Sequence, residues 1–314
     1  PTTLLPITAY WRFFLSGALS VSLSHVVTVP FDVVKTKTQT VPQFTGMNPI
    51  DVTKRVLDEE GPSAFLQGIG PTVSGYFIQG SLKYGCYEYF KPIVRSFLLS
   101  EGIAIDKIYF YMIASFFAES IGSTVLSPFE AARIRMVSKP EFATGLQTCV
   151  KRMTKEEGLI SLYLGLPAML LKNVPYTVVQ LSLFEALTST TYSKLAEMGF
   201  SPEQAFSFHV PITAGSALVA AVAGVVASQP GDSLLSAINK GEDTKVQITN
   251  KIKAKKQEMT LVDSVKILGK IGKELGVKGL FEGIQARMIH VAFIVVIQLL
   301  AYDFIKEICG LPPT

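Results

Sequence analysis

The feature that most constrains the fold is a threefold repeat of about 100 residues. Each copy contains a proline followed two residues later by an acid, and Pro30, Pro128 and Pro230 are spaced 98 and 102 residues apart. The three segments read V-P-F-D-V-V-K (29–35), S-P-F-E-A-A-R (127–133) and Q-P-G-D-S-L-L (229–235). Self-similarity at a fixed period indicates a repeat architecture in which each copy is one structural unit.

Two further elements recur in the same order in every copy. One has paired glycines seven residues apart, at 61/68, 158/165 and 276/283. The other carries an acid close to an aromatic residue and closes the copy, as Y-E-Y-F-K (87–91), F-E-A-L-T (184–188) and Y-D-F-I-K (302–306). We therefore expect a single domain over 1–314 built from repeats at approximately 8–100, 105–197 and 205–310.

Long, mainly apolar stretches flank these signatures, at roughly 11–38, 71–98, 108–138, 167–191, 208–238 and 284–308. Each is long enough to cross a bilayer with some tilt. Hydrophobic residues make up 48% of the chain and charged residues only 17%, against about 25% in soluble proteins, which favours a membrane protein. No stretch of 20 residues is wholly apolar, so we expect helices with one face toward lipid and one toward water.

The prolines predict a kink in the first helix of each pair, because proline removes a backbone hydrogen bond and clashes with the preceding turn. Short amphipathic runs between the paired helices, at 52–59, 148–156 and 261–268, predict helices lying along the membrane surface. The expected fold is an all-α membrane protein with six transmembrane helices in three pseudo-symmetric hairpins.

Charged residues recur at equivalent depths in the three copies. Charge inside a membrane is costly and indicates function. Three hairpins around a pseudo-threefold axis would direct these side chains toward a shared water-filled cavity. Asp32, Glu130 and Asp232 would form one ring, and Glu88, Glu185 and Asp303 a second ring nearer the other end.

The three proline-acid and three aromatic-acid signatures resemble those of the mitochondrial carrier family over nearly the whole chain. The resemblance implies alternating access, multi-pass placement in the mitochondrial inner membrane and short helices on the matrix side. Lys35 and Arg133 would pair with the first ring to close the cavity toward the matrix, and Lys91 and Lys306 with the second ring to close it toward the cytoplasm. The chain departs from the full pattern at Leu235 and Thr188, where bases are expected, so each ring has one acid more than it has bases.

Within this family the chain resembles phosphate carriers most, on S-H-V-V-T-V-P-F-D-V-V-K (24–35), G-Y-F-I-Q-G-S-L-K-Y-G-C-Y-E (75–88), A-E-S-I-G-S-T-V-L-S-P-F-E-A-A-R (118–133) and N-V-P-Y-T (173–177). The resemblance implies transport of inorganic phosphate with a proton, or against hydroxide. Histidine and partly buried carboxylates can exchange protons near neutral pH. The expected proton-coupling residues are His25, Asp32, Glu119 and Glu130.

The anion needs hydrogen-bond donors and positive charge near the middle of the membrane. The expected phosphate-binding residues are therefore Gln79, Lys83, Lys172, Arg287 and Gln298. Two positions depart from the phosphate-carrier pattern, because Gln180 stands where a lysine is expected and Ser123 where an acid is expected.

No enzyme signature is present, and no resident cofactor or metal site is expected. The family resemblance makes cardiolipin a bound lipid and partner, and no nucleic-acid surface is expected. Two alternatives remain: a carrier of another solute such as copper, and a carrier-like structural subunit of a larger inner-membrane complex.

Overall fold

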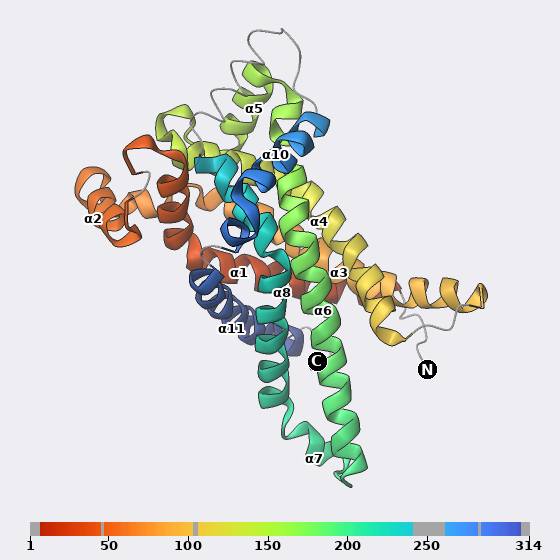
Figure 1. Ribbon diagram of the computed structural model, residues 1–314. Helices are drawn as coiled ribbons and strands as arrows, with labels where there is room; N and C mark the ends of the chain where they lie inside the picture. The colour runs from red at the N-terminus through yellow and green to blue at the C-terminus, as the bar shows by residue number, and fades with distance from the viewer. Residues whose placement is uncertain (1–6, 45–46, 103–105, 241–260, 282–283, 309–314) are drawn as a thin grey trace.

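The computed structural model describes residues 7–44, 47–102, 106–240, 261–281 and 284–308. That part of the chain is mainly helical and contains no strand. Six long helices dominate (Figure 1). They are α1 (Ile7–Thr40), α3 (Ile69–Ser100), α4 (Lys107–Ser138), α6 (Leu166–Glu197), α8 (His209–Lys240) and α11 (Ile284–Ile308). The expected apolar stretches coincide with these helices to within a few residues at most ends.

The long helices form a ring in chain order. Each packs against the next, from α1 through α3, α4, α6 and α8 to α11, and α11 returns to pack on α1. The ring consists of three consecutive helix pairs, one from each sequence repeat, as the repeat predicts.

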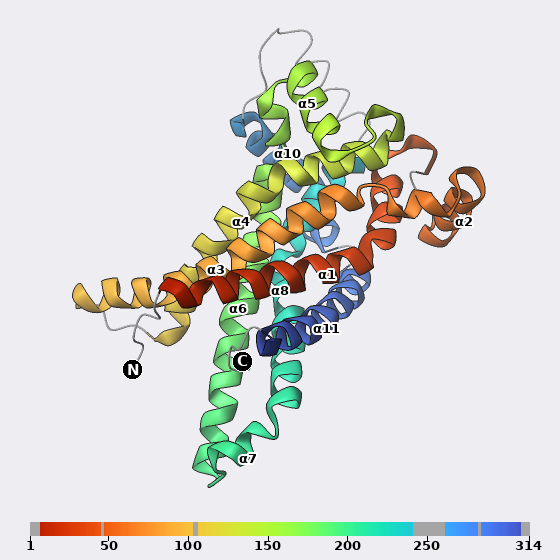
Figure 2. The same cartoon turned by 180° about the vertical axis from the view of Figure 1, so that it is seen from behind.

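A proline lies inside the first long helix of every pair, at Pro30, Pro128 and Pro230, and each helix continues beyond it. The ribbon of α1 changes direction before its C-terminal end (Figure 2). A bend is the expected consequence of a proline inside a helix.

Shorter helices connect the two members of each pair: α2 (Pro49–Glu60), α5 (Leu146–Glu157) and α10 (Leu261–Leu280). The remaining described helices have five residues or fewer. They are η1 (Pro42–Phe44), η2 (Pro62–Leu66), η3 (Pro140–Phe142), η4 (Leu159–Leu162) and α7 (Pro202–Phe206). Gly61, Gly158 and Gly276 have φ angles of 82°, 83° and 59°. This left-handed region favours glycine, which explains why the first glycine of each repeated pair recurs.

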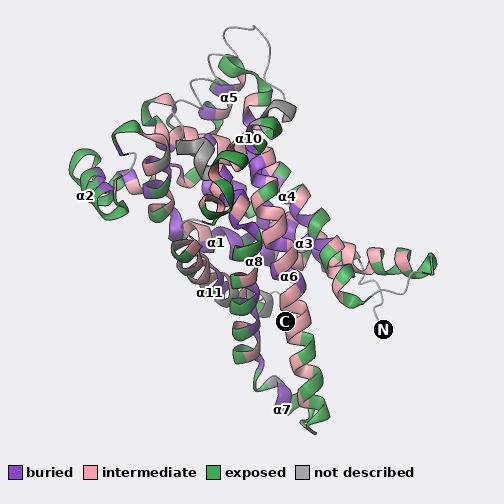
Figure 3. Cartoon of the chain, viewed as in Figure 1, coloured by how far each residue is buried: buried purple, intermediate pink, exposed green. Residues whose placement is uncertain are grey.

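The outer surface of α1 is apolar, and its buried surface carries a line of small polar residues. Leu19, Leu23, Val27 and Phe31, spaced four residues apart, are exposed, whereas the serines and threonine at 16, 20, 24 and 28 are buried. Buried residues gather where the long helices cross, and exposed ones lie on outer faces and ends (Figure 3). In the described part of the chain α1, α4 and α8 are long and apolar enough to cross a membrane. An apolar outside with a polar inside suits lipid around the ring and polar groups within it.

Two long helices approach each other closely where Gly17 of α1 meets Gly80 of α3. A Cβ atom added at either glycine would lie 2.5 Å from the carbonyl oxygen of the other. Only glycine permits the two backbones to come this close.

Candidate functional site

The polar interior of the ring has three parts along its length. The "proline-level cluster" consists of Asp32, Lys35, Glu130, Arg133 and Asp232. The "Glu119 centre" is the buried Glu119 with the side chains that contact it. The "far-end cluster" comprises Glu88, Lys91 and Glu185. The side chains of Asp303 and Lys306, expected at the same level, lie outside the described residues.

Glu119 of α4 is 1% exposed and is surrounded by hydrogen-bond donors from three helices. Ser123 donates to its Oε1 at 2.7 Å and Thr177 of α6 to its Oε2 at 2.8 Å. Gln79 Nε2 of α3 lies 3.1 and 3.3 Å from the two carboxylate oxygens. A buried carboxylate is stable only when such partners replace water, and this one is held in a defined position.

Lys83 supplies the positive charge of the Glu119 centre. Its ammonium lies 3.9 Å from Glu119 Oε2 and donates to Gln180 Oε1 at 3.4 Å. It also lies 5.7 Å from the ring centres of Tyr84 and Tyr176. Lys83 is 7% exposed, so a cation and an anion sit together inside the ring, at a depth where solvent screens them little.

His25 of α1 interacts electrostatically with Asp32, Glu130 and Arg133 of the proline-level cluster. It stacks on Tyr76 of α3, with ring centres 3.6 Å apart and an interplanar angle of 16°. Its Nδ1 is 2.9 Å from the carbonyl oxygen of Val21. A carbonyl only accepts hydrogen bonds, so Nδ1 carries the proton and the other ring nitrogen is the one able to accept another.

Within the proline-level cluster, Arg133 donates from Nε and Nη2 to Glu130 on its own helix, at 3.0 and 2.5 Å. Lys35 of α1 lies 3.7 Å from Asp232 of α8 and joins the first repeat to the third. Asp32 interacts electrostatically with Arg133, Lys35 and His25, but it makes no hydrogen bond or ion pair with the side chains the structure describes.

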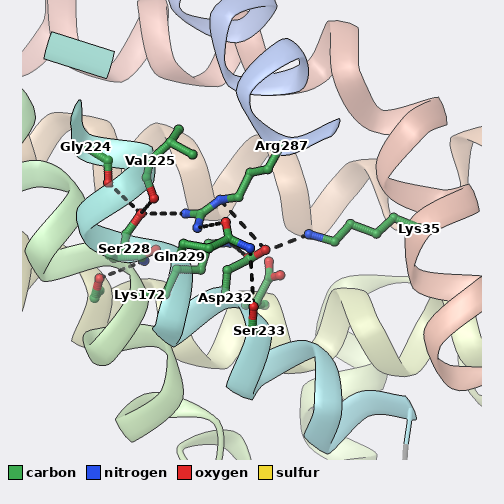
Figure 4. A network of polar contacts seen from close by, with 12 residues as sticks. Lys35, Lys172, Gly224, Val225, Ser228, Gln229, Asp232, Ser233 and Arg287 are labelled. Carbon is green, nitrogen blue, oxygen red and sulfur yellow. Dashed lines mark hydrogen bonds and ion pairs between the residues drawn. The ribbon is translucent and has the colours of Figure 1, made fainter. Parts of the chain in front are cut away.

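Asp232 also receives two cations from the second long helices of the second and third repeats (Figure 4). Lys172 Nζ of α6 lies 3.3 Å from its Oδ1, and Arg287 Nε of α11 lies 3.8 Å from its Oδ2. Arg287 further donates to Ser228 Oγ at 2.8 Å and to Gln229 Oε1 at 3.2 Å. Both residues, expected to bind the anion, thus lie against an acid of the proline-level cluster in this structure.

In the far-end cluster, Lys91 Nζ lies 2.8 Å from Glu88 and 2.8 Å from Glu185. The contact with Glu185 joins the first repeat to the second. The hydroxyl of Thr188, which stands where a base is expected, is buried and has no hydrogen-bond partner among the described residues.

A cavity extends between the far-end cluster and the middle of the ring. Its walls include Glu88 and Glu185 at one end and Tyr84, Gln180 and Gln298 further in. Gln298 of α11 donates to the Tyr84 hydroxyl at 2.5 Å. The expected binding residues Gln79 and Lys83 lie beyond this wall, in the Glu119 centre.

Several residues of the site were not expected from the sequence. Four of them lie inside the stretches 75–88 and 173–177, namely Tyr76, Tyr84, Asn173 and Thr177. The resemblance of these stretches to phosphate carriers indicated the region but not which of its residues contact one another. Ser123, expected only as a missing acid, donates to Glu119 and accepts from Asn173 at 3.0 Å.

A helical ring with an apolar exterior, a charged interior and ion pairs near both ends defines a membrane solute carrier. The chain belongs to the mitochondrial carrier protein family, whose model matches residues 8–97, 106–195 and 208–311. Members of this family are transporters. They are mitochondrial membrane proteins, and so are the phosphate carriers to which this chain is similar.

Three relatives illustrate the similarity. "Mitochondrial substrate carrier family protein N" of Dictyostelium discoideum is 38% identical over 97% of this chain and 96% of its own length. "Solute carrier family 25 member 3" of Homo sapiens is 30% identical over 96% of this chain and 78% of its own. "Phosphate carrier protein, mitochondrial" of Caenorhabditis elegans is 29% identical over 95% of this chain and 81% of its own.

Proposed function

We propose that the chain carries inorganic phosphate across the mitochondrial inner membrane together with a proton, or in exchange for hydroxide, by alternating access. The observation that carries the proposal is the Glu119 centre, which places a buried carboxylate, an ammonium and neutral donors together inside the ring. Relatives named as phosphate carriers, about 30% identical over almost the whole chain, support the choice of solute.

The chemistry of co-transport needs one group that takes a proton and another that attracts the anion. Glu119, His25, Asp32 and Glu130 are the titratable groups we assign to the proton. Ser123 and Thr177 are the donors nearest Glu119, and Lys83 is the cation beside it at 3.9 Å, so a proton arriving on Glu119 would weaken its hold on the ammonium. The ammonium would then be free to attract phosphate as a point charge.

Alternating access requires the two ends of the ring to open in turn. The interhelical pair Lys91–Glu185 would close one end and Lys35–Asp232 the other. Each pair is a contact with two arrangements, made or broken, that the bound solute can bias.

The proposal is tested by reconstituting the purified chain in liposomes and measuring uptake of labelled phosphate. We expect uptake that is faster when the outside is more acidic than the inside, and loss of this acceleration in Glu119→Gln or His25→Gln. Absence of phosphate uptake by the unaltered chain under either gradient would refute the proposed function.

We further propose cardiolipin as a bound lipid. A groove lined by residues 66–71 and 143–146, among others, separates the first two repeats beside η2 and η3. Backbone N–H groups at helix starts attract phosphate groups. Native mass spectrometry of the chain purified in mild detergent should show retained cardiolipin, and complete delipidation should lower the midpoint of thermal unfolding.

The copper alternative has no supporting cluster, because no group of three or more His, Cys, Asp or Glu side chains suited to a metal occurs among the residues described. Membership of a larger complex stays a prediction. Native gels of solubilised mitochondria would decide it, since a structural subunit should migrate only with the complex.

A further inference from the structure

We propose that Lys172 and Arg287 replace the base missing at position 235, lock Asp232 in place, and release it when a doubly charged oxyanion takes them over. The inference deepens the proposed function and rests on it for the identity of the anion. It also gives Lys172 and Arg287 a gating role in addition to the anion contact expected of them.

The third repeat needs such a replacement. In the first two repeats the acid is followed on its own helix by a base, Lys35 or Arg133, whereas Leu235 occupies this position in the third. Leu235 packs on the apolar cluster formed by Ala168, Leu234 and Leu268. It contributes to the junction of α6, α8 and α10 and offers Asp232 no charge.

Three other helices supply the charge instead. Lys35 from α1, Lys172 from α6 and Arg287 from α11 lie 3.7, 3.3 and 3.8 Å from the carboxylate of Asp232 (Figure 4). The side chains of Asp232 and Arg287 are only 12% and 11% exposed. Helices from all three repeats therefore meet at one carboxylate.

The charges at this point do not balance. With Lys172 and Arg287 added, the proline-level cluster has four cations against the three carboxylates of Asp32, Glu130 and Asp232, which leaves one positive charge in excess. A tetrahedral dianion carries two negative charges and has oxygens in several directions, and a guanidinium fork matches two of them. Such an anion competes with Asp232 for Lys172 and Arg287.

The distances favour competition over a permanent ion pair. The contacts of Lys172 and Arg287 with Asp232, at 3.3 and 3.8 Å, are both longer than a charge-assisted hydrogen bond of about 2.7–2.9 Å. Arg287 is oriented separately by Ser228 and Gln229, so it keeps its position when Asp232 leaves. Once Lys172 and Arg287 engage the anion, Asp232 is held by Lys35 alone, and the contact between α1 and α8 can open.

Replacing Asp232 by Asn tests the competition. Phosphate affinity is measured from the concentration dependence of the thermal-unfolding midpoint of the purified full chain, and transport from uptake into liposomes. We expect Asp232→Asn to bind phosphate about three- to tenfold more tightly, because the internal competitor has gone, and to transport it more slowly. Lys172→Met, as a second variant, should bind more weakly. Glu156→Gln, an exposed acid of α5 replaced by its amide, is the matched control and should bind as the unaltered chain does.

Unchanged or weaker phosphate binding by Asp232→Asn, or unchanged binding by Lys172→Met, overturns the competition. The lock itself is tested without any anion, by comparing thermal unfolding of Asp232→Asn, Lys172→Met and the double variant. If the double variant is as stable as the less stable of the two single variants, the two residues form one contact and the lock is supported. If the two losses of stability add fully, the lock is overturned. An unaltered chain that neither binds nor transports phosphate refutes the proposed function and the release step, while the anion-free comparison still decides the lock.

Discussion

Glu119 is a carboxylate whose burial costs free energy and whose position suits it to bind a proton. Its carboxylate is buried among donors from α3, α4 and α6, so these helices are tied together at one point. The same donors fix where a proton can be taken up. A site that must bind and release a proton inside a membrane needs this combination of burial and polar contacts.

Replacing Glu119 by Gln should therefore have two effects. The amide group has an NH₂ that opposes the donors Ser123 or Thr177, so we expect a loss of stability of about 1–3 kcal/mol. The variant can no longer take up a proton at this position, so the acceleration of phosphate uptake by an outside acid gradient should disappear. Thermal unfolding and liposome uptake measure the two effects, and Glu156→Gln serves as the control for both. An unchanged response to the gradient would remove Glu119 from the proton path.

Gln180 stands at a position where the resemblance to phosphate carriers predicts a lysine. Its amide oxygen accepts from Lys83, whereas a lysine there would place a second ammonium next to Lys83. We expect Gln180→Lys to lower the KM for phosphate several-fold and to lower the unfolding midpoint, because two buried ammonium groups repel each other. Gln180→Leu is the comparison, since it removes the acceptor without adding charge. A KM that rises in Gln180→Lys would show that the amide itself serves the anion.

At the scale of helices, the contact of α1 with α3 depends on two glycines. Gly17 and Gly80 bring the two backbones together beside the Glu119 centre, and a side chain on either would collide with the carbonyl oxygen of the other. The distance between these helices therefore controls how Gln79 and Lys83, on α3, face the interior.

We predict that Gly80→Ala destabilises the chain by about 1–3 kcal/mol, the usual cost of overpacking. Gly215→Ala in α8 is the matched control, because an added Cβ there has no atom within 4 Å. Equal midpoints of thermal unfolding for the two variants would contradict the close packing of α1 on α3.

The surface helices are fastened to the long helices by pairs that two repeats share. Lys37 bonds Glu60 at 2.6 and 2.8 Å, and Arg135 bonds Glu157 at the same two distances. The equivalent position of the third repeat, seven residues after its proline, is Ala237, which has no charge to offer. The third repeat thus departs from the other two here as well as at Leu235.

Most of the element order could be predicted, because apolar length, proline position and glycine spacing recur three times. The surface helices at 52–59 and 148–156 were correctly placed, and α10 extends further than the predicted 261–268. Partners were harder to predict. The pair Glu130–Arg133 is three residues apart on one helix, a contact that local spacing allows. The pair Lys35–Asp232 joins two helices, and it depends on how α1 and α8 pack, which no local pattern encodes.

The site was predictable only in outline for the same reason. His25, Lys83 and Glu119 stood out because charge and histidine are rare at membrane depth. Ser123 and Thr177 are common helix residues, and only the fold reveals that both donate to Glu119. The contact of Lys172 and Arg287 with Asp232 joins three helices far apart in sequence and likewise required coordinates.

At the scale of the whole molecule, the ring has an ion pair joining different repeats near each end. Lys91–Glu185 and Lys35–Asp232 differ in length, at 2.8 and 3.7 Å. The shorter contact has two close acidic partners for one lysine, whereas the longer one shares its acid with two further cations. We therefore propose that the two ends of the ring act as unequal gates on one interior path.

The most direct measurement of that claim is phosphate uptake by a chain whose far end can be closed covalently. Cysteines replace Lys91 and Glu185 in a background where Cys86, Cys149 and Cys309 are alanine. A bismaleimide with a reducible link joins the two cysteines, because two non-neighbouring helices that meet only through a lysine–glutamate pair are too far apart for a direct disulfide. The background alone, treated in the same way, is the control for the reagent. Since the two substitutions also remove the ion pair, the untreated double variant gives the reference rate. We predict that crosslinking abolishes phosphate uptake and that a reductant restores the reference rate. Uptake that continues unchanged while the crosslink is fully formed would contradict a path through the interior of the ring.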